Sequence, residues 1–237
     1  MPSKPIFQLR GIGVDYPTPA GVVTGVDEIG IDIPARGLTV LAGPSGSGKS
    51  TLLRVLGLLE RPARGTLTFQ GADTGKLRHS ERRALRRDHL GLIFQNPPDN
   101  LFSYLNVADN LRAAAESART ECRPDEILRQ LGLDGTGRWR ISALSGGQQQ
   151  RLAFGCALAR QSSVILADEP TSQLDEASAD LVLDTLRFLV DQDFAVLVAS
   201  HDERLISLGD RIARLHKGKL EGVETTTADG GEPGGTR

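Results

Sequence analysis

The chain has 237 residues, which suits one large domain, or one domain with a subdomain, and allows a core without disulfides. Its 28 basic and 30 acidic residues give a net charge of −2, so no overall basic field points to nucleic acid. No apolar run approaches the roughly 20 residues of a membrane span, and the first residues lack the apolar stretch of a signal peptide. Two cysteines, Cys122 and Cys156, exclude a disulfide scaffold and suit a reducing cytosol.

Strand patterns dominate the first part of the chain and recur near its end. Isoleucines alternate with polar or small residues over 29–33, which predicts a half-buried strand. Short apolar runs at 38–42, 164–167 and 195–199 are typical of strands that are buried on both faces of a parallel sheet. Helical patterns separate these runs, so the sequence predicts an α/β fold.

The middle of the chain favours helices instead. The patterns at 107–119, 124–131 and 148–160 are helical, with Pro124 suited to a first helical position and Gly132 to a stop. We therefore expect a helical subdomain over about residues 96–160.

This subdomain would interrupt an α/β core formed by residues 1–95 and 161–224, and the whole of 1–224 would be one nucleotide-binding domain. The last stretch, 225–237, is rich in Thr, Gly and acidic residues and lacks periodicity. It is predicted to be a disordered tail because it offers too little apolar surface to bury.

A glycine-rich segment follows the apolar run at 38–42. It fits the pattern G-x-x-x-x-G-K-[ST] and reads Gly43-Pro44-Ser45-Gly46-Ser47-Gly48-Lys49-Ser50-Thr51. Its glycines let backbone N–H groups surround phosphate oxygens, and the following helix adds the partial positive charge of its N-terminus. Lys49 would supply a point charge to the terminal phosphates, and the Ser50 hydroxyl would bind Mg²⁺. The alternative is a plain turn between strand and helix.

Two acidic residues end the apolar run at 164–167. A parallel strand would deliver Asp168 and Glu169 to the sheet edge where open α/β sheets bind ligands, beside the phosphate loop. Asp168 would hold Mg²⁺, mostly through water, and Glu169 would polarise the attacking water. The alternative is a solvated acid pair at a strand end.

A third motif narrows the class. The sequence Leu144-Ser145-Gly146-Gly147-Gln148 precedes the predicted helix and forms a second anion cradle, with a hydroxyl, glycine N–H groups and a helix N-terminus. Together with the two motifs above, it resembles the ATP-binding cassette (ABC) ATPase family over about residues 6–222. The resemblance implies a P-loop NTPase (RecA-like) parallel sheet core with an N-terminal antiparallel β subdomain and an inserted helical subdomain.

In that family, the signature meets the γ-phosphate of an ATP that is bound by a second subunit. The resemblance therefore implies a head-to-tail dimer, of identical or different subunits, that sandwiches two ATP molecules. Gln95 matches the Q-loop glutamine, which reaches Mg²⁺ or the attacking water. His201 matches the switch histidine, which would bond the γ-phosphate and orient Glu169; a structural or exposed histidine is the alternative.

Two further positions follow from the resemblance. Tyr16, 27 residues before Gly43, resembles the aromatic residue that stacks on adenine, where a flat ring gives affinity with little selectivity. Its alternatives are core packing or an aromatic residue of a loop. Asp175 matches the D-loop acid that couples the two sites, although Gln173 departs from the small residue or Asn that family members more often carry.

Two surface segments remain open to interpretation. The segment 76–87 carries six basic residues, and it is either a solvated helix face or a contact for a phosphate-rich membrane face or an acidic coupling element. Phe102, Tyr104 and Leu105 fall in the region that, in the family, receives the coupling helix of the transmembrane partner. They would be interface anchors there, or they would be buried in the helical subdomain.

The resemblance implies an ATPase subunit, cytoplasmic and held at the inner face of the membrane by a separate transmembrane permease, with no nucleic-acid partner. The phrases Gly43-Pro44-Ser45 and Gln148-Gln149-Gln150-Arg151 are similar to the lipoprotein-releasing and macrolide-export group. A small-solute importer is the alternative. A non-transport ABC ATPase is disfavoured by the single cassette without heptads, and the signature argues against a simple kinase.

Overall fold

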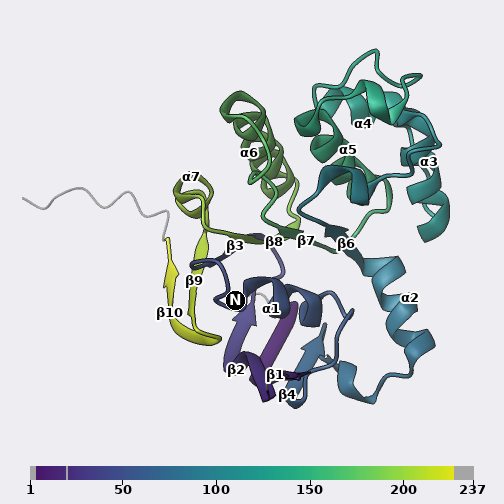
Figure 1. The fold of residues 1–237 in the computed structure, drawn as a ribbon. Helices are drawn as coiled ribbons and strands as arrows, with labels where there is room; N and C mark the ends of the chain where they lie inside the picture. Colours follow the sequence, from purple (N-terminus) through teal and green to yellow (C-terminus); the bar gives the residue numbers. More distant parts are fainter. Residues whose placement is uncertain (1–3, 20, 227–237) are drawn as a thin grey trace, which may run out of the picture.

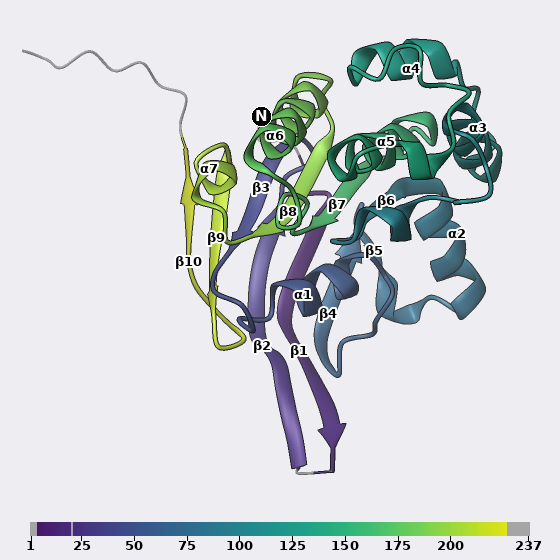
Figure 2. The same ribbon diagram turned by 45° about the horizontal axis from the view of Figure 1, so that its top comes forward.

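The computed structural model describes residues 4–19 and 21–226. Within those residues, the chain forms two sheets with helices packed between and around them (Figure 1). The antiparallel sheet has the order β2-β1-β4-β5, with β1 (Phe7–Thr18), β2 (Gly21–Ile33), β4 (Arg64–Phe69) and β5 (Ala72–Asp73). β1 and β2 form a hairpin that projects beyond the rest of the sheet (Figure 2).

The second sheet is parallel except at one edge. Its order is β10-β9-β3-β8-β7-β6, with β10 (Lys219–Thr225), β9 (Arg211–His216), β3 (Gly37–Ala42), β8 (Ala195–Ser200), β7 (Val164–Asp168) and β6 (Leu90–Ile93). Only β10 runs antiparallel to its neighbour. The predicted α/β fold, with its parallel core and N-terminal antiparallel sheet, is confirmed.

The α-helices are α1 (Lys49–Leu56), α2 (His79–His89), α3 (Val107–Ala118), α4 (Pro124–Gln130), α5 (Gly146–Ala159), α6 (Glu176–Asp191) and α7 (Glu203–Ile206). Three 3-10 turns are also described, at Thr74–Lys76, Pro97–Asn100 and Ile141–Ala143. Helices α3, α4 and α5 all fall between β6 and β7, where helices were predicted. Among the helices described, none combines the length and apolar character that a membrane crossing requires.

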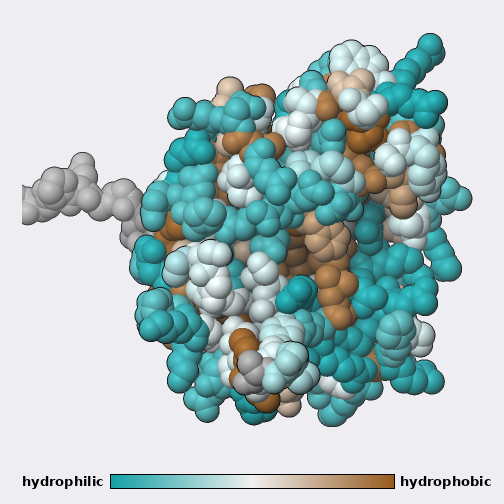
Figure 3. Space-filling model, viewed as in Figure 1, coloured by the Kyte–Doolittle hydropathy of each residue, from teal (hydrophilic) through white to brown (hydrophobic). Residues whose placement is uncertain are grey.

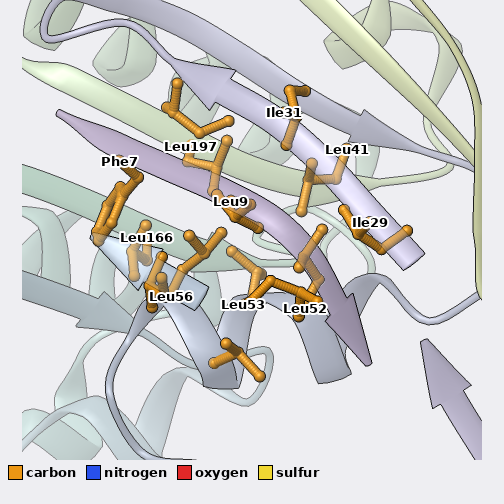
Figure 4. Close-up of a cluster of buried hydrophobic side chains, with 14 of the residues drawn as sticks. Phe7, Leu9, Ile29, Ile31, Leu41, Leu52, Leu53, Leu56, Leu166 and Leu197 are labelled. Atoms are coloured by element: carbon orange, nitrogen blue, oxygen red, sulfur yellow. The ribbon is translucent and has the colours of Figure 1, made fainter. Parts of the chain in front are cut away.

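Helix α1 is buried between the two sheets. Its Leu52, Leu53 and Leu56 contact apolar residues from both sheets, including Leu9 of β1 and Leu41 of β3 (Figure 4). This packing fixes the start of α1, and hence the loop before it, against the carboxyl end of β3.

The opposite face of the parallel sheet is covered by α5 and α6. Alternate residues of β3 serve the two faces, because Leu41 belongs to the core around α1 and Val40 to the core around α6. This two-sided burial explains the continuous apolar runs in the sequence. A further apolar cluster holds α3, α4 and α5 together.

The strand register brings the candidate site residues to one edge of the parallel sheet. Ala42 of β3 pairs with Ser200 of β8, and Ala199 pairs with Asp168 of β7. The carboxyl ends of these three strands are therefore level, as the prediction of a common edge required.

Two boundaries differ from those predicted. Strand β10 continues through Thr225, and the N–H of Thr226 donates to the carbonyl of Asp210, so the predicted tail over 225–237 begins too early. Residues 227–237 lie outside the described part of the chain. Helix α5 begins at Gly146 because Ser145 caps it, two residues before the predicted start.

Candidate nucleotide-binding site

The phosphate loop joins β3 to α1. Gly48 has a φ of 101°, a left-handed conformation that favours glycine, and a Cβ there would lie 2.6 Å from the carbonyl oxygen of Gly25. Gly43 is equally confined, since its Cβ would lie 2.2 Å from the carbonyl oxygen of Leu215. Close backbone approach therefore requires glycine at positions 43 and 48, which keeps the loop compact.

Lys49 lies inside this loop and is only 5% exposed. Its Nζ donates to the carbonyl oxygens of Gly43 (2.7 Å) and Pro44 (3.1 Å) and lies 3.4 Å from Glu169 Oε1. The ammonium group is thus held at the N-terminus of α1, where the helix dipole adds positive potential. This combination suits an anion such as a phosphate group.

Ser50 and Asp168 face each other across the edge of the sheet. Ser50 Oγ donates to Asp168 Oδ1 at 3.0 Å. Burial raises the pKa of Asp168; the hydrogen bond from Ser50 lowers it, and the nearby Glu169 carboxylate raises it. A hydroxyl and a carboxylate oxygen are ligands that Mg²⁺ prefers, with substrate phosphates and water completing the shell. The residues therefore fit this metal.

Glu169 and His201 extend from the ends of adjacent strands. His201 Nδ1 lies 2.9 and 3.0 Å from the two carboxylate oxygens of Glu169. Glu169 has a φ of 46°, uncommon for a residue with a side chain, and its N–H donates to the carbonyl of Ala199. The backbone turn at Glu169 is thus held by the sheet, and it aims the carboxylate at Lys49 and His201.

Gln95 follows β6 and reaches the same edge. Its Nε2 donates to Ser172 Oγ at 3.0 Å, and Ser172 Oγ donates to the backbone carbonyl of Glu169 at 3.0 Å. A chain of two hydrogen bonds therefore connects Gln95 to the Glu169 backbone.

These residues line one cleft of about 380 Å³. Its wall consists of Tyr16, Val23, Thr24, Gly25, Ser45, Gly46, Gly48, Lys49, Ser50, Thr51, Gln95, Glu169 and His201. The predicted residues Gly43, Pro44 and Ser47 support the loop from outside this lining, and Ser47 is buried. Asp168 adjoins the cleft through Ser50. The structure thus brings the phosphate loop, Tyr16, Gln95, Glu169 and His201 together.

The signature does not join this cleft. Ser145 caps α5: its Oγ accepts from the N–H of Gln148, and its own N–H donates to Gln148 Oε1. Asp175 caps α6 in the same way, accepting from the N–H and hydroxyl of Ser178. Gly147 packs against Ser178, where a Cβ would lie 2.7 Å from the Ser178 Cβ. The signature and Asp175 therefore form a second, neighbouring surface apart from the cleft.

Comparison with known proteins decides the protein family. A protein-family model described as ABC transporter matches residues 26–172. The lipoprotein-releasing system ATP-binding protein LolD of Novosphingobium aromaticivorans is 40% identical over 225 residues, which cover 92% of this chain and 100% of that protein. The chain belongs to the ABC transporter family. It is an ATP-binding subunit that hydrolyses ATP to ADP and phosphate.

Two other relatives place this ABC ATPase in context. The macrolide export ATP-binding/permease protein MacB 1/2 of Paracoccus denitrificans is 37% identical over 236 residues, covering 97% of the ABC ATPase but only 35% of that protein. A solved dimeric ATP-binding cassette, MJ0796, bound to ADP and Pi in a post-hydrolysis state, is 30% identical with a TM-score of 0.81. That match covers 92% of the ABC ATPase and 98% of the solved chain.

Sequence reasoning missed some residues that line the ABC ATPase cleft and others that support it from outside the lining. Gly25 contributes backbone to the wall, and no pattern in the sequence marks it. Ser172, the partner of Gln95, could have been found as a hydroxyl three residues after Glu169, at turn spacing. Arg54 and Glu60, which contact the Tyr16 hydroxyl, carried no signal because they join Tyr16 only through the fold.

The basic segment 76–87 is only partly a solvated face. Arg82 is 4% exposed, and its Nη2 donates to the carbonyls of Leu58 and Glu60 at 3.0 and 2.8 Å. Arg82 therefore fits neither of the interpretations given for this segment: it ties α2 to the end of α1. The neighbouring Arg83 is exposed and lines a shallow surface pocket.

The predicted aromatic surface is exposed, and asparagine side chains bond to its backbone. Phe102 is 51% and Tyr104 71% exposed, so burial in the helical subdomain is the wrong interpretation for both. The amide of the buried Asn110 accepts from the N–H of Phe102 and donates to its carbonyl, and Asn100 holds Phe94 in the same way. The face drawn in Figure 3 shows an apolar hollow near its centre, in the region of β6 and α1.

Proposed function

We propose that this ATPase drives export, or extraction of a lipid-linked cargo, through a separate membrane permease that holds it at the cytoplasmic face of the membrane. The observation that carries this proposal is the end-to-end match to the ATP-binding protein of a lipoprotein-releasing system. The macrolide-export relative, whose name joins ATP-binding and permease functions, supports the same direction of transport.

In the proposed cycle, ATP occupies the cleft with its phosphates on the loop. Lys49 exchanges its bonds to loop carbonyls for bonds to the β- and γ-phosphates, and Tyr16 receives the adenine. Ser50, Asp168 and Gln95 would hold Mg²⁺, which neutralises charge on the phosphate oxygens when bound. The loop residues that line the cleft, Ser45, Gly46, Gly48 and Thr51, supply the remaining donors.

Glu169 is the proposed general base. Its carboxylate takes a proton from the attacking water, the water oxygen bonds to the γ-phosphorus, and the bond to the β–γ bridging oxygen breaks, leaving ADP and phosphate. His201 orients this carboxylate through Nδ1. A ring that donates from Nδ1 to Glu169 can also donate from Nε2 to a γ-phosphate oxygen only as an imidazolium.

The signature is proposed to act on a second subunit. Ser145, Gly146, Gly147 and Gln148 form an anion cradle outside the cleft of their own chain, which supports a role on the γ-phosphate of a partner. Asp175 would cross the same interface. The dimeric form of the solved relative supports this arrangement.

The proposed domain is residues 1–224, with the helical subdomain at 96–160 as the docking region for the permease. A neighbouring apolar pocket is lined by Leu59, Leu92 and Phe94 and also by Ser50 and Asp168. A permease segment bound in this pocket would therefore contact the proposed Mg²⁺ ligands, which would couple docking to hydrolysis.

The deciding experiment is a pull-down from detergent-solubilised membranes with the tagged chain, followed by identification of the copurifying proteins. We expect a polytopic membrane subunit whose addition changes the ATPase rate. Recovery of ribosomes or nucleic acid in place of a membrane subunit would contradict the proposal.

A further inference from the structure

The hydroxyl of Tyr16 sits at the corner of a closed triangle of polar contacts. Tyr16 Oη donates to Glu60 Oε2 at 2.9 Å and accepts from Arg54 Nη2 at 2.9 Å. Arg54 Nε lies 3.5 Å from the same Glu60 oxygen, and its guanidinium carbon lies 5.9 Å from the Tyr16 ring centroid. A phenol has one proton to donate and lone pairs to accept, so both bonds are satisfied at once.

This triangle is anchored to rigid structure. The N–H of Glu60 donates to the carbonyl of Arg54, and the carbonyl of Glu60 accepts from Arg82, which is buried. These bonds fix the backbone of Glu60 between α1 and α2, which limits how far its carboxylate can follow the Tyr16 ring. The hydroxyl end of the tyrosine is therefore held by the last turn of α1 and by the segment that follows it.

The ring itself is confined from β2. A Cβ on Gly25 would lie 2.7 Å from Tyr16 Cε2 and 3.1 Å from Thr51 Cγ2. Gly25 thus packs close to the ring edge, and both residues line the nucleotide cleft. The tyrosine is pinned at its hydroxyl and along one edge, and it contributes its surface to the cleft.

Helix α1 connects this arrangement to the phosphate loop. It begins at Lys49 and carries Arg54 in its last turn. One helix of eight residues therefore sets the phosphate donors at its start and holds the tyrosine hydroxyl near its end. The spacing between the two parts of a nucleotide site is fixed by a single rigid element.

We propose that Arg54 and Glu60 are positioning residues that lock the Tyr16 ring in the orientation that receives the nucleobase. The inference rests on the proposed stacking role of Tyr16 and extends it to residues outside the cleft lining. Ordering a side chain before binding removes its entropy cost from the binding step. Loss of these contacts should lower the affinity for nucleotides, because the ring would no longer be held ready for the base. The affinity for inorganic triphosphate, which has no base, should not change.

The test compares the dissociation constants of ATP and inorganic triphosphate for Glu60→Ala and Tyr16→Phe. Each variant is expected to bind ATP about three- to tenfold more weakly, the scale of one immobilised side chain, with triphosphate affinity unchanged. The rise in KM for ATP should exceed any change in kcat. Glu60→Gln, which keeps an acceptor oxygen, should restore most of the affinity.

Two further measurements separate positioning from general damage. The double variant Tyr16→Phe/Glu60→Ala should bind ATP no more weakly than either single variant, because one lock is broken in all three. Glu221→Ala, an exposed acid of β10 outside the cleft lining, is the matched control. Tyr16→Phe keeps the ring and tests the lock even if Glu60→Ala folds poorly.

Failure of the positioning role and failure of the stacking role of Tyr16 would give different results. If Tyr16→Ala loses ATP affinity while Glu60→Ala and Tyr16→Phe bind like wild type, the positioning role is overturned and stacking survives. If Tyr16→Ala binds ATP as tightly as wild type, stacking itself is wrong. Equal loss of triphosphate and ATP affinity in Glu60→Ala would also overturn the inference, since Glu60 would then act on the whole cleft.

Discussion

Lys49 Nζ lies 3.4 Å from Glu169 Oε1, so the cation of the phosphate loop is paired with the proposed general base inside the same cleft. Both side chains are largely buried, at 5% and 13% exposure. A buried pair of this kind leaves a costly uncompensated charge when either partner is removed. Binding of a γ-phosphate would draw Lys49 away and leave Glu169 free to accept a proton.

Replacing the proposed base should separate binding from turnover. Glu169→Gln keeps the shape of the side chain but removes its basicity, so we expect ATP to bind while kcat falls by about 10²- to 10⁴-fold. Because the bound ATP is not consumed, the variant should accumulate as a dimer with Mg-ATP, measurable by light scattering. Hydrolysis at the wild-type rate would show that Glu169 is not the base.

The phosphate loop can be tested through its cation. Lys49→Ala removes charge-assisted hydrogen bonds to phosphate, each of about 1.5–3 kcal/mol, so ATP affinity should fall roughly ten- to a hundredfold. Lys76→Ala, at a lysine whose side chain is 84% exposed, is the control and should bind normally. Titration of a fluorescent ATP analogue measures both. Unchanged affinity in Lys49→Ala would reject the phosphate cradle.

The contact between His201 and Glu169 predicts a rate effect without a binding effect. His201→Ala removes both short contacts to the carboxylate, so kcat should fall at least about tenfold while the ATP dissociation constant changes little. His79→Ala, at the exposed first residue of α2 and outside the cleft lining, serves as control. A His201 variant that hydrolyses ATP normally would remove this residue from the mechanism.

The aromatic surface predicts a partner-specific defect. Phe102 and Tyr104 form a tilted pair with ring centroids 5.7 Å apart, and the Asn110 amide preorders the backbone of Phe102. Truncating either ring to alanine should weaken association with the membrane subunit by about 1 kcal/mol or more, while the isolated chain keeps its ATPase rate. Leu181→Ala, at an exposed apolar residue of α6 outside residues 96–160, should associate normally; equal weakening by all three variants would contradict a localised anchor.

Neighbouring arginines of α2 should differ sharply in their effect on stability. Arg82→Met leaves the carbonyl of Glu60 without its side-chain donor, while the carbonyl of Leu58 keeps its bond from Arg86. The loss should lower the free energy of unfolding by about 1–3 kcal/mol. Arg83→Met changes an exposed side chain and should alter it by less than about 0.5 kcal/mol. Denaturant unfolding followed by circular dichroism measures both. Equal effects would show that the buried ties contribute nothing.

Much of this molecule could be predicted from local pattern. The apolar runs predicted the parallel strands, because a strand that is buried on both faces carries apolar residues on both. The cap at Ser145 could be predicted because it is a hydrogen-bond motif between residues close in sequence. The motifs at Lys49 and Glu169 could be placed together because parallel strands end at a common edge. These features depend on residues that are close in sequence, or on a general rule of sheet topology.

The remaining features depend on contacts between distant segments. Tyr16 meets Glu60 across 44 positions, and Gln95 meets Ser172 across 77. Whether Arg82 is buried is decided by how α2 lies against the end of α1, which no helical pattern reveals. The clamp of Asn110 on the backbone of Phe102 spans only eight positions, but no pattern in the sequence marks it.

The left-handed backbone of Glu169 has a consequence for how this enzyme can be improved. Such a conformation costs about 1–3 kcal/mol for a residue with a side chain, and glycine would adopt it without that penalty. Substitution by glycine would relieve this backbone cost, but it would also leave the buried Lys49 ammonium without its carboxylate partner. The strain at Glu169 therefore cannot be removed without losing both the charge pairing of the phosphate loop and the proposed base.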